Sequence, residues 1–202
     1  MEDVAAVYAG DWVTLILCSD GTLWGVGSGL FGLLPERAAS QDAYDPLFLM
    51  SDVVMAAVSS ESACALRSDG TVWSWGGSEG FQPEQILEGI VKIAAYSSGH
   101  YALDIDGTLY VWGSLLPLEV DRNECWLTPQ PILEGVTDMA STGRRLLVQK
   151  EDSSLWRMGW WEGINISRWR SGWTMWSTSL RISQLPGTTH FGTWPQIPQA
   201  CS

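Results

Sequence analysis

Histidine, cysteine and basic residues are scarce in this chain of 202 residues, which has two histidines, four cysteines and eleven lysines and arginines. Neither His100 nor His190 has a cysteine or carboxylate at ligand spacing, and a metal site needs three or four ligands. The cysteines form no CxxC pair. We therefore expect no metal, no cofactor and reduced thiols, which favours a cytoplasmic location.

Positive charge and long apolar runs are also lacking. Against the eleven basic residues stand 23 acidic ones, so the formal net charge is −12. Binding to nucleic acid needs a basic face, and an anionic membrane surface would repel this chain. No apolar run reaches transmembrane length, and Met1-Glu2-Asp3 lacks the basic start of a signal peptide. These features predict a protein that binds neither nucleic acid nor a membrane.

The feature that is abundant is a repeat. The tripeptide Asp-Gly-Thr occurs at residues 20–22, 69–71 and 106–108, and a diverged fourth copy is Asp152-Ser153-Ser154. The copies are spaced by 49, 37 and 46 residues. A period of about 45 residues is typical of repeat architectures, most of which bind other molecules.

Strand-like alternation flanks each copy. Aromatic or apolar residues stand four and six positions after the Asp, and a glycine stands seven positions after it. Apolar residues also stand five and three positions before the Asp, except for Gln149 at the latter position in the fourth copy. Two strands joined by Asp-Gly predict a β-hairpin with a type I′ turn, in which Asp and Gly tolerate positive φ. The predicted turn residues are Asp20, Gly21, Asp69, Gly70, Asp106 and Gly107. The phased aromatics expected in the core are Trp24, Trp73, Trp75, Tyr110, Trp112 and Trp156.

A third apolar element precedes each hairpin. Its residues stand sixteen and thirteen positions before the Asp, at Val4 and Val7 in the first copy. Several short strands and turns without a helical period predict a propeller blade rather than a solenoid coil.

Two of the units resemble a known repeat. The strings Gly99–Gly113 and Cys64–Gly76 are similar to the repeat of the regulator of chromosome condensation family, whose members form β-propellers, usually of seven blades. The resemblance implies an all-β fold, a partial β-propeller of about four blades, with units at 1–49, 50–86, 87–132 and 133–162. Seven blades would need well over 300 residues. We therefore expect self-association through open blade edges, or marginal stability.

Residues 163–202 differ from the repeats in composition. All 23 acidic residues precede residue 163, and the last forty residues carry three arginines and no acid among many Trp, Ser and Thr. Two interpretations stay open. The segment is either a diverged fifth unit, echoed faintly in Leu180-Arg181-Ile182, or a disordered tail of foreign origin, which the absence of acids favours.

Two motifs that suggest chemistry have structural explanations. Residues 27–32 fit the dinucleotide pattern GxGxxG, but that pattern works only between a strand and a helix. Here Gly27 is the glycine of the repeat. Asp104 and Asp106 would share a strand face, as acid–base pairs can. Asp106, however, is a turn residue, and the other units carry unrelated residues at the position of Asp104. We therefore interpret the position of Asp104 as a variable, solvated one.

Three tryptophans fall outside the repeat phase, in predicted loops between blades: Trp126, Trp160 and Trp161. Loop tryptophans on a rigid scaffold are candidate contacts for a protein partner. The alternative is packing under a long loop.

Three functions follow from these observations. The first is a non-catalytic protein-binding scaffold that presents loops between strands to an unidentified protein. Within the family that the chain resembles, known roles are nucleotide exchange on a small nuclear GTPase and inhibition of β-lactamases by a bacterial relative, but no motif here is specific to either. The second is a truncated or decayed repeat fragment without activity of its own. The third, an enzyme, is disfavoured because no cluster of His, Cys or carboxylates recurs in the units.

Overall fold

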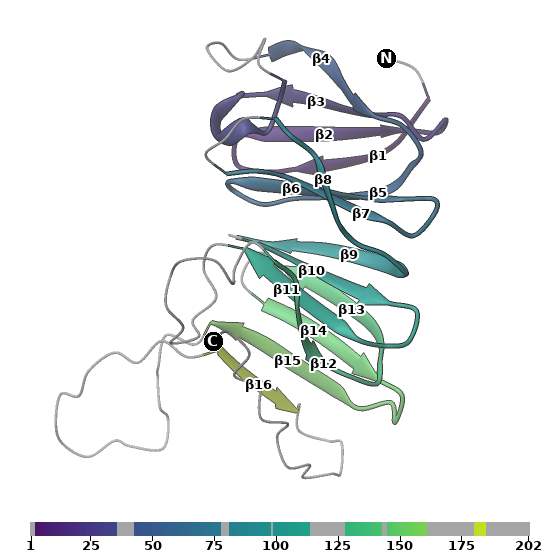
Figure 1. Cartoon of the computed structure of the whole chain (residues 1–202). Coiled ribbons are helices and arrows are strands. Elements are labelled where there is room, and N and C mark those ends of the chain that lie inside the picture. Colours follow the sequence, from purple (N-terminus) through teal and green to yellow (C-terminus); the bar gives the residue numbers. More distant parts are fainter. Residues whose placement is uncertain are drawn as a thin grey trace, which may run out of the picture.

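The fold is built from four antiparallel four-stranded sheets. A computed structural model of the chain describes residues 3–35, 43–77, 81–97, 99–113, 128–142, 145–160 and 180–184. In these ranges the sheets follow one another in chain order, with the first and the fourth at opposite ends of the stack (Figure 1). We call the sheets blades one to four. The all-β prediction is thus confirmed.

The strands of blades one and two are β1 (Val4–Ala9), β2 (Val13–Cys18), β3 (Leu23–Gly27), β4 (Ala43–Met50), β5 (Val53–Val58), β6 (Ser62–Arg67), β7 (Val72–Gly76) and β8 (Glu84–Leu87). Those of blades three and four are β9 (Ile90–Tyr96), β10 (Gly99–Asp104), β11 (Leu109–Gly113), β12 (Gln130–Leu133), β13 (Val136–Thr142), β14 (Arg145–Lys150), β15 (Leu155–Trp160) and β16 (Leu180–Gln184). One short 3-10 helix, η1 (Leu30–Gly32), follows β3.

The fourth strands of blades one to three end close to the predicted unit boundaries. β4, β8 and β12 each end one residue after the boundaries at 49, 86 and 132. In blade four the last strand, β16, pairs with β15 and comes from the atypical segment 163–202. The predicted boundary at residue 162 therefore passes between the third and fourth strands of one sheet.

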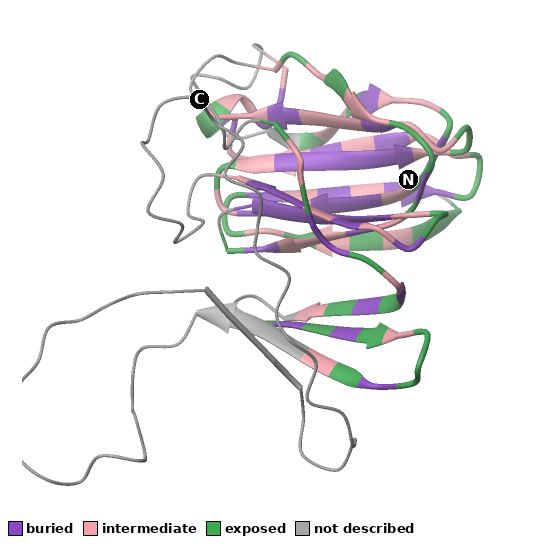
Figure 2. Ribbon diagram, turned by 60° about the horizontal axis from the view of Figure 1, so that its bottom comes forward, coloured by how far each residue is buried: buried purple, intermediate pink, exposed green. Residues whose placement is uncertain are grey.

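Three apolar clusters hold the stack together, one at each interface between blades. Leu15, Leu17 and Leu23 of blade one pack near Val53 and Ala56 of blade two. The same repeat positions form the cluster between blades two and three and that between blades three and four. Buried residues follow the inner strands of the sheets (Figure 2). Blades two and three thus each bury one face against the preceding blade and the other against the next.

The hairpin turns also attach each blade to the next through the backbone. The carbonyl of each turn glycine accepts a hydrogen bond from the first residue of the following blade. These bonds are Val53 N to Gly21 O (2.9 Å), Ile90 N to Gly70 O (3.0 Å) and Val136 N to Gly107 O (2.9 Å). The repeat is therefore a unit of assembly as well as of sequence.

Candidate interaction site at the blade turns

Each Asp-Gly turn is a three-residue loop. In blade two, Arg67 N donates to Thr71 O and Gly70 N donates to Arg67 O, and the other blades repeat this pair of bonds. Gly70 has a φ of +82°, whereas Asp69 is not among the residues with positive φ. This is a type I turn followed by a left-handed glycine. The predicted type I′ turn is therefore wrong in turn type, although the glycine is needed in both.

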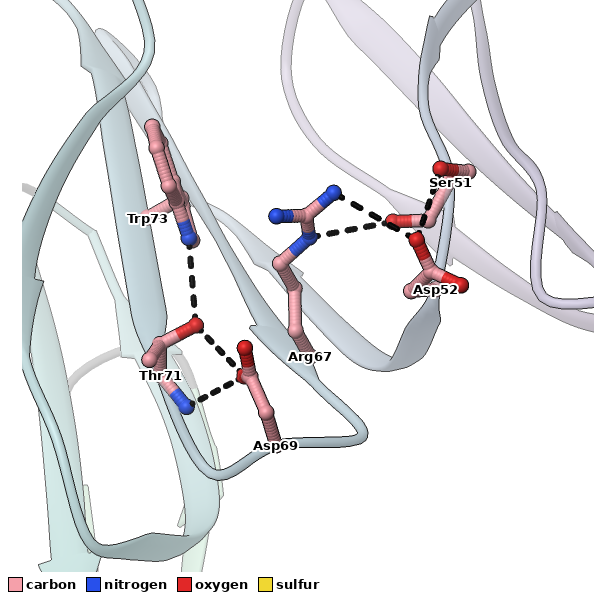
Figure 3. Close-up of polar contacts among 6 residues, drawn as sticks. All are labelled: Ser51, Asp52, Arg67, Asp69, Thr71 and Trp73. Atoms are coloured by element: carbon pink, nitrogen blue, oxygen red, sulfur yellow. Dashed lines mark hydrogen bonds and ion pairs between the residues drawn. The ribbon is translucent and has the colours of Figure 1, made fainter.

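The turn Asp connects to the aromatic residue four positions later. Asp69 Oδ1 accepts hydrogen bonds from Thr71 N (3.0 Å) and Thr71 Oγ1 (2.6 Å), and Thr71 Oγ1 accepts one from Trp73 Nε1 (3.1 Å) (Figure 3). Blade one has the same relay from Trp24 through Thr22 to Asp20. The bonds from the threonines hold the pKa of both Asp carboxyls below the ordinary value.

The third and fourth turns achieve the same shape with different residues. In blade three Asp104 Oδ1 accepts from Asp106 N (3.0 Å) and Thr108 N (2.7 Å). Asp104 is therefore an acceptor within the turn, and it is half-buried rather than fully exposed. In blade four Ser153 replaces the glycine and takes a φ of +64°.

A cation lies over the aromatic ring in two of the blades. In blade two the Arg67 guanidinium carbon is 5.4 Å from the ring centroid of Trp73. Its Nε donates to Ser51 O (3.1 Å), and Nη2 lies 3.5 Å from Asp52 Oδ2 (Figure 3). In blade four Lys150 Nζ is 5.9 Å from the Trp156 centroid, with Lys150 at the same repeat position as Arg67. Cation–π attraction favours this arrangement.

Blade one has the ring without the cation. Cys18 stands at the position of Arg67 and Lys150, and Asp3 stands at the position of Asp52. An open hollow of about 700 Å³ lies there. It is lined by Asp3, Cys18, Ser19, Asp20, Thr22, Trp24 and Pro46. Comparison of repeat positions in the sequence could have found this site, because only the residue two positions before the turn Asp breaks the pattern.

The outward faces of the end blades expose residues that the other blades bury. Val4 and Val7 are 45% and 59% exposed, whereas their counterparts in blades two to four are 2–4% exposed. On blade four, Leu147 and Leu155 are 44% and 43% exposed. Their counterparts on blade one, Leu15 and Leu23, are fully buried.

A buried polar network joins blades two and three. Ser59 Oγ donates its proton to Ser62 O (3.0 Å), and it therefore accepts from the Ser62 hydroxyl (2.9 Å). Because the Ser62 hydroxyl proton is used in that bond, Ser62 Oγ accepts from His100 Nε2 (2.9 Å). Nδ1 of His100 then accepts from the Cys64 thiol (3.4 Å). Burial lowers the pKa of His100 to about 3 and raises that of Cys64. Without an opening to solvent this network is structural, since His100 is 0% exposed.

The tryptophans predicted to bind a partner are only partly visible. Trp126 and Trp161 lie outside the described residues. Trp160 is the last residue of β15, so its predicted position in a loop is wrong, and its side chain is outside the described residues as well. The core prediction is correct for Trp75 and Trp112, both 3% exposed. The aromatics four positions after the Asp are half-buried, and two of them, Tyr110 and Trp156, pack against the interface clusters.

Other candidate sites give no active centre. The GxGxxG stretch runs from β3 into η1, which has three residues, and no longer helix follows it among the residues that the structure describes. Within the described part of the chain, no three His, Cys, Asp or Glu residues are grouped to hold a metal ion. No helix in that part is long and apolar enough to cross a membrane.

Four such blades define a partial β-propeller. No protein-family model matches the chain, and no curated protein matches it. Solved structures do match. Prp20p from Saccharomyces cerevisiae, crystallised in a study of its binding to Gsp1p and histones, superposes with a TM-score of 0.72 and 19% identity, over 94% of this chain and 52% of Prp20p.

Two further structures agree with this match. The same yeast protein, described as RCC1 bound to Kap60, gives a TM-score of 0.72 at 19% identity, over 94% of this chain and 51% of that one. Human WBSCR16 gives a TM-score of 0.62 at 18% identity, over 79% of this chain and 49% of WBSCR16. The chain thus spans about half the length of these proteins. The resemblance to condensation-regulator propellers is confirmed for the fold.

Proposed function

We propose that the protein is a non-catalytic protein-binding β-propeller scaffold. The fold supports this role, because its structural neighbours are described with protein partners: Gsp1p and histones for Prp20p, and Kap60 for yeast RCC1. The repeat units supply rigid sheets joined by loops, and binding residues are commonly placed on such loops. The unit boundaries at 49, 86 and 132 and the partner contacts at Trp126, Trp160 and Trp161 stay part of this proposal.

The first partner that we propose is a second copy of the chain, in head-to-tail arrangement. The observation that carries it is the pair of open faces. Val4 and Val7 on blade one occupy the positions that pack on a preceding blade everywhere else in the stack. Leu147 and Leu155 on blade four occupy the positions that pack on a following blade. Blade four of one copy would therefore pack on blade one of another, as consecutive blades do within the chain.

The backbone supports the same direction of assembly. The carbonyls of Gly21, Gly70 and Gly107 bond to the following blade. Ser153 is the fourth member of this series, and the described residues contain no fifth blade to donate to its carbonyl. Val4 N of a second copy would take that place.

Sedimentation velocity on the full chain tests this partner. We expect concentration-dependent association of the native chain and a loss of affinity of about tenfold or more in Val7→Asp and in Leu147→Asp, because each buries a charge in the contact. Val54→Asp is the matched control, since Val54 is a 52% exposed strand valine away from both faces. A mixture of the two face variants should form a dimer and nothing larger, because each retains one intact face. A monomeric native chain would contradict the proposed self-association.

A second experiment tests binding to other proteins. Affinity capture with the full chain should retain a stoichiometric protein that is lost in Trp126→Ala or Trp160→Ala. Trp12→Ala is the control for removal of an exposed tryptophan, since Trp12 is 49% exposed in the loop between β1 and β2. Equal capture by all four proteins would contradict a role for the loop tryptophans.

A further inference from the structure

Blade two shows how this repeat holds an arginine. The guanidinium of Arg67 lies against the Trp73 ring, bonds to Ser51 O and pairs with Asp52. The indole N–H of Trp73 is itself fixed by Thr71, and Thr71 by Asp69 (Figure 3). The ring is thus held by hydrogen bonds that do not involve the guanidinium. A preordered receptor of this kind binds a cation with little loss of side-chain freedom.

Blade one repeats the receptor and omits the arginine. Trp24, Thr22 and Asp20 form the same relay as in blade two, with distances of 2.9 Å and 2.7 Å along it. Asp3 stands at the position of Asp52. At the position of Arg67, Cys18 has a side chain too short to reach the ring face that a guanidinium would cover, and the hollow lies there.

The backbone sets Asp3 and Asp52 apart from their counterparts. Both take a left-handed φ, of 58° and 61°. The equivalent residues in blades three and four are Gly89 and Gly135, which adopt this conformation without strain. In blade two the carboxylate has a partner in Arg67. In blade one the corresponding residue, Asp3, lines the open hollow.

We propose that this hollow on blade one binds an arginine side chain of a protein partner, which reproduces between two molecules the contact that Arg67 makes within one. The guanidinium would stack on Trp24 and pair with Asp3. Arginine is preferred to lysine because a planar guanidinium can stack on a ring and bond to a carboxylate at once. This inference rests on the proposed function as a protein-binding scaffold and names the chemistry of its ligand.

Docking of a second copy on blade one does not close this site. Trp73 is only half-buried although blade one covers the sheet to which Trp73 belongs. The Trp24 side chain would keep a similar exposure to solvent in an assembled pair.

The test is a titration of the full, isotope-labelled chain with N-acetyl-arginine methylamide, followed by the NMR signals of the Trp24 indole N–H and the Thr22 amide. We expect saturable shifts at both signals. The citrulline analogue, which is neutral and of nearly the same shape, should bind about tenfold more weakly, because it lacks the cation. Equal shifts with the two analogues would overturn the proposal.

Three variants separate the site from the rest of the protein. Cys18→Arg fills the hollow from within, as Arg67 does in blade two, and should abolish the shifts. Cys18→Ser keeps the hollow open and should retain them. Asp3→Asn keeps a residue that tolerates left-handed φ and removes only the charge, so binding should weaken several-fold. Unchanged binding by Cys18→Arg would overturn the proposal.

The outcomes also distinguish this inference from the proposed function. Binding of the arginine analogue without capture of any protein would support the site and contradict the scaffold. Capture of a partner with equal affinity by the native chain and by Cys18→Arg would support the scaffold and contradict the site.

Discussion

The inner interfaces and the outer faces of this stack are built from the same repeat positions. Thirteen residues before the turn Asp, Ile93 is 4% exposed between blades two and three, whereas Val7 on the outer face of blade one is 59% exposed. Sixteen residues before it, Ile90 is 3% exposed and Val4 is 45% exposed. All four side chains are β-branched and aliphatic, so the difference in exposure comes from the presence or absence of a neighbouring blade.

The comparison shows that burial in a repeat protein is a property of the interface rather than of the unit. A blade cannot cover its own apolar faces, so its stability depends on its neighbours. The end blades therefore carry the surfaces on which another protein would change stability most. Substitutions at equivalent positions can measure this dependence directly.

The largest effect is expected from Ile93→Ala. Removal of a buried isoleucine side chain from the interface between blades two and three should lower the free energy of unfolding by about 2–4 kcal/mol, through lost burial and the cavity left behind. Val7→Ala at the same repeat position should cost below about 0.5 kcal/mol in the monomer. Chemical denaturation at low protein concentration measures both.

A large cost for Val7→Ala at low concentration would break the comparison. It would mean that the outer face of blade one is covered by part of the same chain. A cost that appears only at high concentration would instead agree with association between copies.

Much of this fold could be predicted from the sequence, because the repeat displays its own alternation four times. The hairpins, the phased glycines and the strand that precedes each hairpin follow from side-chain periodicity. The turn type does not follow from periodicity. Asp and Gly are favoured both in the predicted type I′ turn and in the three-residue turn that is observed, and the composition does not distinguish the two loop lengths. The fourth strand of blade four could not be predicted, because β16 comes from the segment whose composition departs from the repeat.

The polar contacts between and within blades, and the candidate site itself, were harder to predict for a different reason. Cys64 and His100 meet across two blades, at a separation of 36 residues that no local pattern encodes. Asp104 replaces Asp106 as the acceptor in its turn, which depends on backbone geometry. The hollow beside Trp24 depends on the short side chain of Cys18. The sequence shows that Cys18 and Arg67 share a repeat position, but only the structure shows that Arg67 lies over the Trp73 ring.

A second prediction concerns the polar part of an inner interface. Burial lowers the pKa of His100 to about 3, below the ordinary value of about 6.5. The neutral ring is therefore favoured in the folded state, and this stability is fully present above pH 6.5 and is lost as the pH falls toward 3. Between pH 7 and pH 5 the free energy of unfolding should fall by about 2 kcal/mol.

The variant His100→Gln isolates this dependence. It is less stable at pH 7 because it disrupts the bonds to Ser62 and Cys64, but its stability should change little over the same pH range. Denaturant titrations at four pH values compare the slopes. Parallel slopes for the native chain and the variant would show that His100 does not control the pH dependence of this interface.

The smallest expected effect on the free energy of unfolding concerns the fourth turn, which has serine where the first three turns have glycine. Ser153 has a φ of +64° where the other turns have glycine, and a residue with a Cβ is strained there. Ser153→Gly should therefore raise the free energy of unfolding by about 0.5–1 kcal/mol. The converse change, Gly70→Ser, should lower it by about 1 kcal/mol. A Cβ at Gly70 would lie 3.6 Å from Ile90 O, an ordinary contact, so the cost is conformational rather than steric. Thermal or chemical denaturation of the two variants measures the difference, and a loss of stability in both would mean that the Ser153 side chain contributes more than its backbone costs.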